Sequence, residues 1–223
     1  MENKNMTKKK SNPLAALIKD ALALFVITLV SGLALSFIYE ITKEPIATQK
    51  LLKEEEASQK VFSDAVTFED DEELMEKIRE AGDLEELDPI YKGITIDSVR
   101  KDYDEDHNLL GYNIGVSTTN GYKDVISLMI GYSLDGTIKG IAITSINETP
   151  GLGMLVTGKE FINQYIGKEV SRFVVTTKGA SSEEEIDAIT MATISTDAVT
   201  NAINSAIDII QRFATDLGGG QSE

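Results

Sequence analysis

The most constraining feature of this sequence is an uncharged apolar stretch that runs from Ala21 to Tyr39. Its 19 residues would form a helix of about 28 Å at about 1.5 Å per residue, close to the hydrocarbon thickness of a bilayer. A cleaved signal peptide has a shorter apolar core, and the weak cleavage match at Ala34–Ser36 is followed by further apolar residues. The stretch therefore predicts an uncleaved transmembrane helix.

Charges flank this stretch unequally. The lysines that precede it are Lys4, Lys8, Lys9, Lys10 and Lys19, whereas those that follow are mixed with glutamates such as Glu40 and Glu44. The positive-inside rule then places the N-terminus in the cytoplasm and the rest of the chain outside. We therefore expect a single-pass protein of the cell membrane, with a cytoplasmic tail over residues 1–20 and a transmembrane helix over residues 21–39.

Composition narrows the chemistry open to the external part. The 223 residues include no cysteine and one histidine, and the formal net charge is −16. Thiolate-held iron–sulfur clusters, cysteine-type zinc sites and multi-histidine metal sites within the chain are thereby excluded. The acidic balance argues against a nucleic-acid partner, which attracts a positive surface. A redox role would need an organic cofactor or a partner's metal.

Residues 40–90 are predicted to form an acidic helical stalk and the entry to a domain. Helical spacing of apolar residues predicts a helix over Glu73–Ala81. The acidic run is typical of a solvated face, and a docking surface for a cationic partner is the alternative. Beyond the domain, residues 217–223 are expected to be a flexible tail.

From residue 91 the pattern changes to β-rich segments that are separated by turns. The expected strands are Gly93–Val99, Gly111–Val116, Val125–Tyr132, Thr137–Ser145 and Phe173–Val175. Asp135-Gly136 predicts a hairpin turn with positive φ at both positions. A short helix is expected over Gly158–Tyr165, and an amphipathic helix over Ser195–Phe213, capped by Ser195 or Thr196 with Asp197 in its first turn. Residues 91–216 therefore predict one α+β domain, with an antiparallel sheet and flanking helices.

The first motif with chemical content is Glu148-Thr149-Pro150-Gly151-Leu152-Gly153, directly after an expected strand. Pro150-Gly151 fixes a turn, and two glycines separated by one residue let the backbone approach a ligand closely. Glu148 at the strand end would orient a polar group of that ligand. A plain turn with an incidental glutamate is the alternative.

The second motif is the hydroxyl-rich run from Asp187 to Thr196, which lies just before a helix N-terminus. Free N–H groups and the helix dipole favour an anion such as a phosphate at that position. A hydroxyl-rich capping sequence without a ligand is the alternative reading of the same residues.

Together, Glu-Thr-Pro-Gly-Leu-Gly followed by Asp-x-x-Thr-x-Ala-Thr before a C-terminal helix resembles the covalent FMN-binding domain family. With the N-terminal anchor, the chain is similar to the G subunits of Rnf-type ion-translocating ferredoxin:NAD oxidoreductases. The C subunits of Na⁺-translocating NADH:quinone reductases are near relatives of that group. The resemblance implies FMN held by a phosphoester on the last threonine of the motif, which is Thr193.

The resemblance also assigns roles to other residues. A flavin transferase would recognise Asp187, Thr190 and Ala192, while Glu148, Thr149, Leu152 and Gly153 would line the flavin, with Lys178 near it. The chain departs from the family at Met191, where the family usually has glycine. A residue other than glycine is costly wherever φ must be positive.

The function implied by the resemblance is that of an electron-transfer subunit without independent catalytic activity. It would belong to a membrane complex that couples ferredoxin:NAD⁺ oxidoreduction to Na⁺ or H⁺ translocation. Its partners would be the other subunits, the flavin transferase during maturation, and membrane lipid. Two alternatives remain open: a hydrolase that pairs Ser or Thr with His107, and an anchored extracytoplasmic sensor or interaction domain without redox activity.

Overall fold

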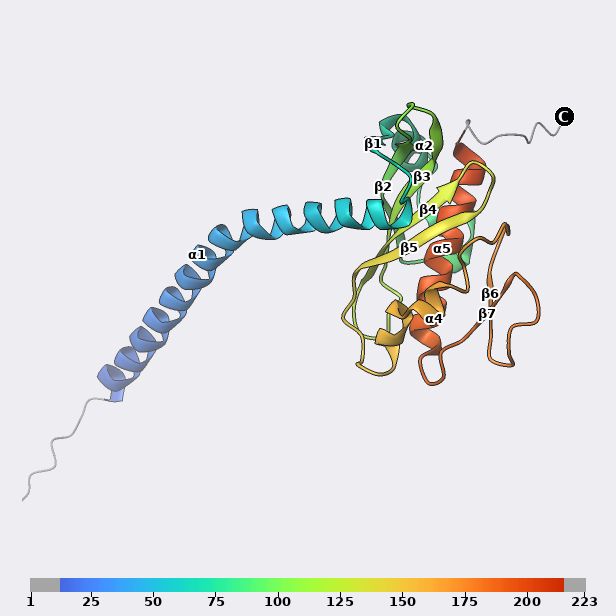
Figure 1. Cartoon of the computed structure of the whole chain (residues 1–223). Coiled ribbons are helices and arrows are strands. Elements are labelled where there is room, and N and C mark those ends of the chain that lie inside the picture. Colours follow the sequence, from blue (N-terminus) through green and yellow to red (C-terminus); the bar gives the residue numbers. More distant parts are fainter. Residues whose placement is uncertain (1–12, 215–223) are drawn as a thin grey trace, which may run out of the picture. The chain divides into compact units, whose positions relative to one another are not determined.

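The computed structural model describes residues 13–214, so the first part of the expected cytoplasmic tail and the expected C-terminal tail lie outside the described residues. The chain divides into two compact units, residues 1–51 and residues 52–223. A single helix, α1 (Pro13–Val61), contributes to both units and continues through Pro45 (Figure 1). Proline inside a helix usually kinks or ends it, but α1 continues past Pro45 to Val61.

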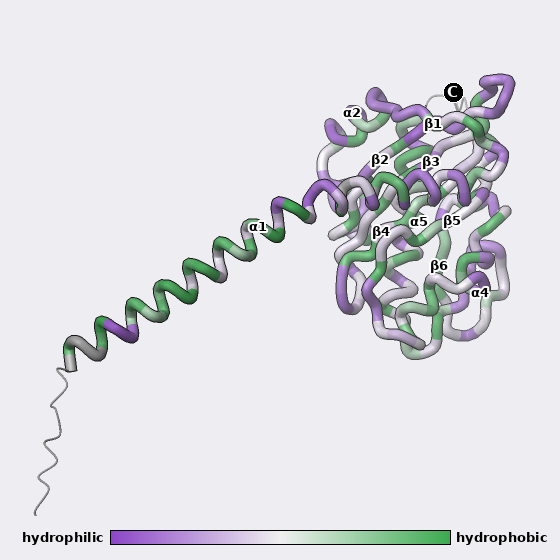
Figure 2. Tube along the Cα trace, turned by 60° about the vertical axis from the view of Figure 1, so that its left-hand side comes forward, coloured by the Kyte–Doolittle hydropathy of each residue, from purple (hydrophilic) through white to green (hydrophobic). Residues whose placement is uncertain are grey.

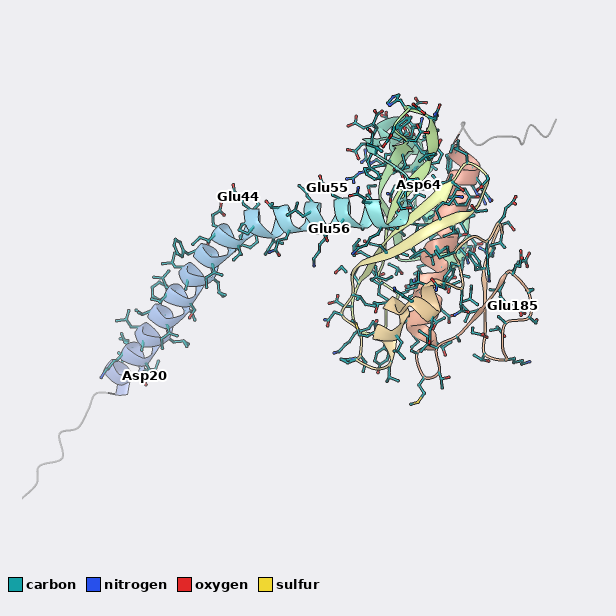
Figure 3. The ribbon with its side chains drawn as sticks, in the orientation of Figure 1. Asp20, Glu44, Glu55, Glu56, Asp64 and Glu185 are labelled. Carbon is teal, nitrogen blue, oxygen red and sulfur yellow. The ribbon has the colours of Figure 1, made fainter. Side chains whose placement is uncertain are left out.

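The first unit is the apolar part of α1. The segment Leu17–Val61 has a window of mean hydropathy 2.5, none of it buried, and is long and apolar enough to cross a membrane. Hydrophobic residues cover this part of the helix, and hydrophilic residues predominate in its last turns (Figure 2). Asp20 and Glu44 lie at the two ends of the apolar stretch (Figure 3). An uncharged helix bracketed by charges is the pattern of a membrane anchor.

The second unit is built on a five-stranded antiparallel sheet in the order β1-β2-β3-β4-β5. Its strands are β1 (Thr67–Asp70), β2 (Ile94–Tyr103), β3 (Leu109–Thr118), β4 (Ile126–Ser133) and β5 (Ile138–Ser145). Helix α2 (Glu72–Glu80), helix α3 (Leu84–Leu87) and the 3-10 turn η1 (Pro89–Tyr91) connect β1 to β2. Each strand pairs with its sequence neighbour, so short turns suffice to connect β2 through β5.

The chain after β5 returns through short elements to one long helix. These elements are η2 (Gly153–Thr157), α4 (Lys159–Ile162), β6 (Val174–Thr176), β7 (Glu185–Asp187) and α5 (Thr193–Phe213). Strands β6 and β7 form a separate two-stranded parallel sheet. Helix α5 contacts β2, β3 and β4, and its apolar side chains join Ile114, Val116 and Ile130 of the sheet in the main core. The architecture confirms the expected α+β domain with an antiparallel sheet and flanking helices.

The last turns of α1 pack against β4 and β5, where two facing positions have no side chain. Gly131 and Gly140 are directly paired on β4 and β5. A Cβ atom at Gly131 would lie 2.8 Å from the carbonyl oxygen of Val61, and one at Gly140 would lie 2.5 Å from the Cα atom of Val61. The helix approaches the sheet this closely because both positions lack a side chain. Ala57 and Val61 also pack on Met129 in a small apolar cluster.

Three local expectations from the sequence are wrong. In the hairpin between β4 and β5, Gly136 has φ of +85°, but Asp135 is not among the described residues with positive φ. The amide of Gly136 donates to the carbonyl of Ser133 at 3.0 Å. The hairpin is therefore the type in which a turn is followed by a glycine in the left-handed conformation, and not the type with a two-residue loop. The helix expected over Gly158–Tyr165 is only the four-residue α4. The third correction concerns the start of α5 and belongs to the candidate site.

Candidate functional site

A cavity of about 500 Å³ lies where the loop after β5 meets the N-terminus of α5. Its walls are Tyr122, the loop residues Glu148, Thr149, Leu152 and Gly153, and the consecutive residues Met191–Ser195. This size is typical of pockets for small organic ligands. The two sequence motifs, separated by more than thirty residues, thus form one concave site.

The loop after β5 is shaped by a tight turn. The amides of Leu152 and Met154 both donate to the carbonyl of Thr149, at 3.1 and 3.2 Å. Pro150 and Gly151 occupy the central positions, and Gly151 has φ of +75°, as a type II turn requires. The turn expected at Pro150-Gly151 is therefore confirmed, and it holds Thr149 and Leu152 at the cavity wall.

Glu148 is a buried carboxylate, with 3% of its surface exposed. Its Oε1 atom accepts a hydrogen bond from the amide of Lys123 at 3.2 Å. Its Oε2 atom has no hydrogen-bond partner within the described part of the chain. Burial of an unpaired polar atom costs free energy, and such atoms usually have a partner. Because Glu148 lines the cavity, a ligand with a hydrogen-bond donor would supply that partner.

Gly153 allows the loop and the helix to meet. A Cβ atom at this position would lie 2.7 Å from Glu148 Oε2 and 2.6 Å from Ser195 Oγ. Both separations are shorter than non-bonded contacts allow, so any other residue would displace one of the two side chains. Gly153 is needed here for the close approach of the loop to the side chains of Glu148 and Ser195, whereas the sequence had suggested close approach to a ligand.

Helix α5 begins at Thr193 and not at Ser195, and this is the third correction. The residue at the N-cap is Ala192, which provides no side-chain cap. Thr196 instead donates through Oγ1 to the carbonyl of Ala192 at 3.0 Å and accepts from the amide of Ile189 at 3.2 Å. Asp197 consequently lies in the second turn, where burial raises the pKa of its carboxyl group.

The uncapped start of α5 leaves polar hydrogens facing the cavity end of the helix. The amide of Thr196 donates to the carbonyl of Ala192 at 3.0 Å, so the amides of Thr193, Ile194 and Ser195 precede the first helical hydrogen bond. The first turn carries no acidic residue. The N-terminus of a 21-residue helix with free amides favours an anionic group.

Met191 adopts a backbone conformation that glycine would adopt without cost. The amide of Ala192 donates to the carbonyl of Ile189 at 2.9 Å, which places Met191 third in a four-residue turn. Its φ is +65°, the value that a type II turn demands at this position. A side chain in the left-handed region costs about 1–2 kcal/mol. Met191 is therefore strained at a position where the family usually has glycine.

The structure separates the expected site residues into two groups. Glu148, Thr149, Leu152, Gly153, Ala192 and Thr193 line the cavity. Asp187, Thr190 and Lys178 are exposed and are not among the residues that line it. Asp187 ends β7 and accepts from the amide of Ala180 at 2.6 Å through Oδ1, whereas the amide of Lys178 donates to Thr176 Oγ1 at 3.2 Å.

Four further residues of the cavity wall had not been assigned an individual role: Tyr122, which lies outside both motifs, and Met191, Ile194 and Ser195, which lie within the run Asp187–Thr196. Tyr122 comes from the turn before β4, and no spacing rule connects it with the other motifs. Ile194 and Ser195 follow from the earlier start of α5, which places them in the first turn. Had the sequence pointed to a helix start at Thr193, both residues would have been expected at the site.

Comparison with known proteins agrees with this geometry. Residues 121–208 match the FMN-binding domain family, and the whole cavity wall falls within this range. The chain is 33% identical to the G subunit of the Na(+)-translocating ferredoxin:NAD(+) oxidoreductase complex of Acetobacterium woodii, over 88% of this chain and 92% of that protein. It is 30% identical to the G subunit of the ion-translocating oxidoreductase complex of Methanosarcina acetivorans, over 86% and 93% of the two chains.

Among solved structures, the C subunit of the Na(+)-translocating NADH-quinone reductase from Parabacteroides distasonis aligns with a TM-score of 0.48 at 17% identity, over 75% of this chain and 95% of that chain. The sequence relatives are the stronger finding, because they extend over nearly the full length of both proteins. The chain belongs to the family of G subunits of ion-translocating oxidoreductase complexes.

Proposed function

We propose that this protein is the electron-transfer subunit of a membrane complex that couples ferredoxin:NAD⁺ oxidoreduction to Na⁺ or H⁺ translocation, and that it carries FMN as a phosphoester on Thr193. The observation that carries the proposal is the position of Thr193. It is the first residue of α5, it is exposed, and it lines the cavity that also contains Glu148. A phosphate on its hydroxyl would lie at the uncapped helix N-terminus.

The donor set of the cavity fits FMN. The free amides at the start of α5 suit the phosphate, because they and the helix dipole stabilise negative charge. Tyr122, Leu152 and Ile194 provide apolar wall for the ring system. The unpaired Oε2 of Glu148 matches a ligand that carries a hydrogen-bond donor, such as a ring N–H or a ribityl hydroxyl group.

In this proposal the protein tethers, orients and shields its cofactor. FMN supplies one- and two-electron redox chemistry and so connects carriers of the two kinds. The amides at the start of α5 hold the phosphate, and Glu148 orients a donor group of the cofactor. Gly153 leaves the space that the side chains of Glu148 and Ser195 occupy. No acid–base catalyst in the chain is required for electron relay, and the subunit would have no independent catalytic activity.

The apolar part of α1 would anchor the domain to the membrane. The lysines before the span favour a cytoplasmic N-terminus and an extracytoplasmic domain. A covalent tether has a physical reason in that location, since free FMN would diffuse away. A flavin transferase would act on the run Asp187–Thr193 during maturation, and the other subunits of the complex would bind the mature protein.

Mass spectrometry of the full chain, produced together with a flavin transferase, tests the proposal. We expect a mass increase equal to FMN less one water, located on the peptide that contains Thr193, and in-gel flavin fluorescence. Thr193→Ala should abolish both. Thr157→Ala is the matched control, because it removes the hydroxyl group of another exposed threonine that does not line the cavity.

Two outcomes would contradict the proposal. Fluorescence that persists in Thr193→Ala at the wild-type level would show that another residue carries the flavin. A colourless wild-type protein without the mass increase would favour the alternative function of an anchored sensor or interaction domain without redox activity.

A further inference from the structure

Two residues other than glycine have positive φ in the described part of the chain: His107 at +60° and Met191 at +65°. Both positions are strained for an L-amino acid. The two residues differ in the local contacts that offset their backbone strain, and this difference points to a role for Met191.

The strain at His107 is offset by local contacts. The carboxylate of Asp104 accepts from the amides of Asp106 and Asn108 at 2.9 and 2.8 Å, which fixes the turn that contains His107. The imidazole ring stacks on Tyr103, with the ring centroids 4.6 Å apart and an interplanar angle of 9°. The turn and the stacking account for the conformation without any ligand.

The turn that contains Met191 is also closed by a hydrogen bond, from the amide of Ala192 to the carbonyl of Ile189, but the side chain of Met191 has no contact like the stacking of His107 on Tyr103 within the described residues. Its side chain is 81% exposed, although methionine is usually buried. Glycine at this position would avoid the strain, so the side chain is present at a cost. Strained backbone tends to occur at functional sites. Met191 lines the cavity, and one residue separates it from Thr193.

We propose that Met191 is a positioning residue whose thioether packs against the flavin ring at the mouth of the cavity and limits the access of solvent to the ring. This inference rests on the proposed function, because it requires a flavin held at Thr193. Methionine suits the role because its side chain is flexible and its sulfur makes favourable contacts with aromatic rings. The contact would bury an apolar group that is otherwise exposed, which offsets the backbone strain.

The test compares thermal stability with and without the flavin. Full-length wild type and Met191→Gly are each produced with and without the flavin transferase, and the flavin content is verified by mass spectrometry. Without flavin, Met191→Gly should raise Tm by about 2–4 °C, because it relieves the strain. With flavin, that gain should shrink or reverse, since the contact with the ring is lost. Such a difference measures the coupling between the side chain and the flavin.

Two further variants separate the contact from the strain. Met191→Ala keeps a side chain at positive φ but removes the thioether, so its Tm should fall only in the flavinylated protein, and iodide should quench the flavin fluorescence more strongly. His107→Gly is the matched control. It removes the other strained residue, outside the cavity, and should shift Tm equally in both forms.

The results distinguish two failures. If wild type carries no flavin, the proposed function fails and this inference fails with it. If wild type is flavinylated and Met191→Gly shifts Tm equally with and without flavin, only the role of Met191 is overturned.

Discussion

Two buried carboxylates of this domain share an unusual property, and their surroundings differ. Glu148 and Asp102 are 3% and 0% exposed, and in the described structure Oε2 of Glu148 and both carboxyl oxygens of Asp102 have no hydrogen-bond partner. Glu148 is part of the wall of the cavity. Asp102 lies on β2, in the part of the sheet near the last turns of α1, and is not among the residues that line the cavity.

The neighbours of Asp102 form a buried polar cluster, which comprises Ser58, Arg100, Asp102 and Asn113. Asn113 donates to the carbonyl of Ser58 at 3.3 Å, and Arg100 extends towards Ser58 Oγ at 3.5 Å. Asn113 also has an unpaired Oδ1 within the described residues. Burial raises the pKa of Asp102 to about 8, against the opposing effects of Arg100 and Asn113. The O–H group of a protonated Asp102 would be a hydrogen-bond donor for an acceptor of this cluster such as Asn113 Oδ1.

The comparison teaches that a buried carboxyl group without hydrogen-bond partners can be accommodated in two ways. An enclosed carboxyl group keeps its proton, because no ligand or solvent reaches it to stabilise the charge. A carboxylate at a cavity wall can instead be satisfied by the molecule that binds there. The effect on stability of neutralising each group should therefore depend on a different variable: on pH for Asp102, and on the presence of flavin for Glu148.

The largest expected effect is that of Asp102→Asn on the pH dependence of stability. Because the pKa of Asp102 is raised to about 8 in the folded state, the folded protein keeps a proton that the unfolded chain releases near pH 4. Wild-type stability should therefore fall as pH rises from about 4 to about 8, by up to about 1.4 kcal/mol per pH unit. Asp102→Asn removes this slope and should be the more stable protein at pH 9.

Urea denaturation at pH 5, 7 and 9 measures this effect. Asparagine retains a neutral side chain with a hydrogen-bond donor, so the fold should tolerate it. Parallel stability curves for the two proteins over this range would show that Asp102 does not hold its proton. The difference should be the same with and without flavin.

A smaller effect is expected for Gly153→Ala. The new Cβ atom would meet Glu148 Oε2 at 2.7 Å and Ser195 Oγ at 2.6 Å, so the cavity wall must shift. We expect a loss of about 1–3 kcal/mol of stability and a lower flavin content. The double variant Gly153→Ala/Glu148→Ala should recover part of the stability, because one of the clashing atoms is gone. Full wild-type stability in the single variant would contradict the close packing of loop and helix.

The sequence predicted much of the fold, because hydrophobic pattern and turn residues are local signals. Strands β2 to β5, α2, α5 and the turn at Pro150-Gly151 were all expected near their observed places. Strand β1 was not expected, since Thr67–Asp70 lies in an acidic stretch and its pairing with β2 is a tertiary contact. The pairing of β6 with β7 was missed for the same reason, since each strand has only three residues and β7 was not expected at all.

The candidate site was predictable only where a local rule applied. Gly153 and Glu148 followed from a turn motif, and Thr193 from the resemblance to a family. The start of α5 was misplaced by two residues because Ser195 and Thr196 are good capping residues, whereas the observed N-cap is Ala192. Asp102 gave no signal at all. Its burial depends on the approach of α1 to Gly131 and Gly140, which the sequence of β2 does not show.

The smallest expected effect, that of Glu148→Gln, is the most informative about the cavity. Glutamine keeps the shape and retains an acceptor, so the flavin-free protein should lose less than about 1 kcal/mol of stability. Hydrogen bonds to a charged group contribute about 1.5–3 kcal/mol, against about 0.5–1.5 kcal/mol for neutral pairs. The flavinylated protein should therefore lose about 1 kcal/mol more than the flavin-free protein, as measured by urea denaturation of both forms. An equal loss in the two forms would show that Glu148 does not bond to the cofactor, and that its unpaired oxygen, like those of Asp102, belongs to the fold alone.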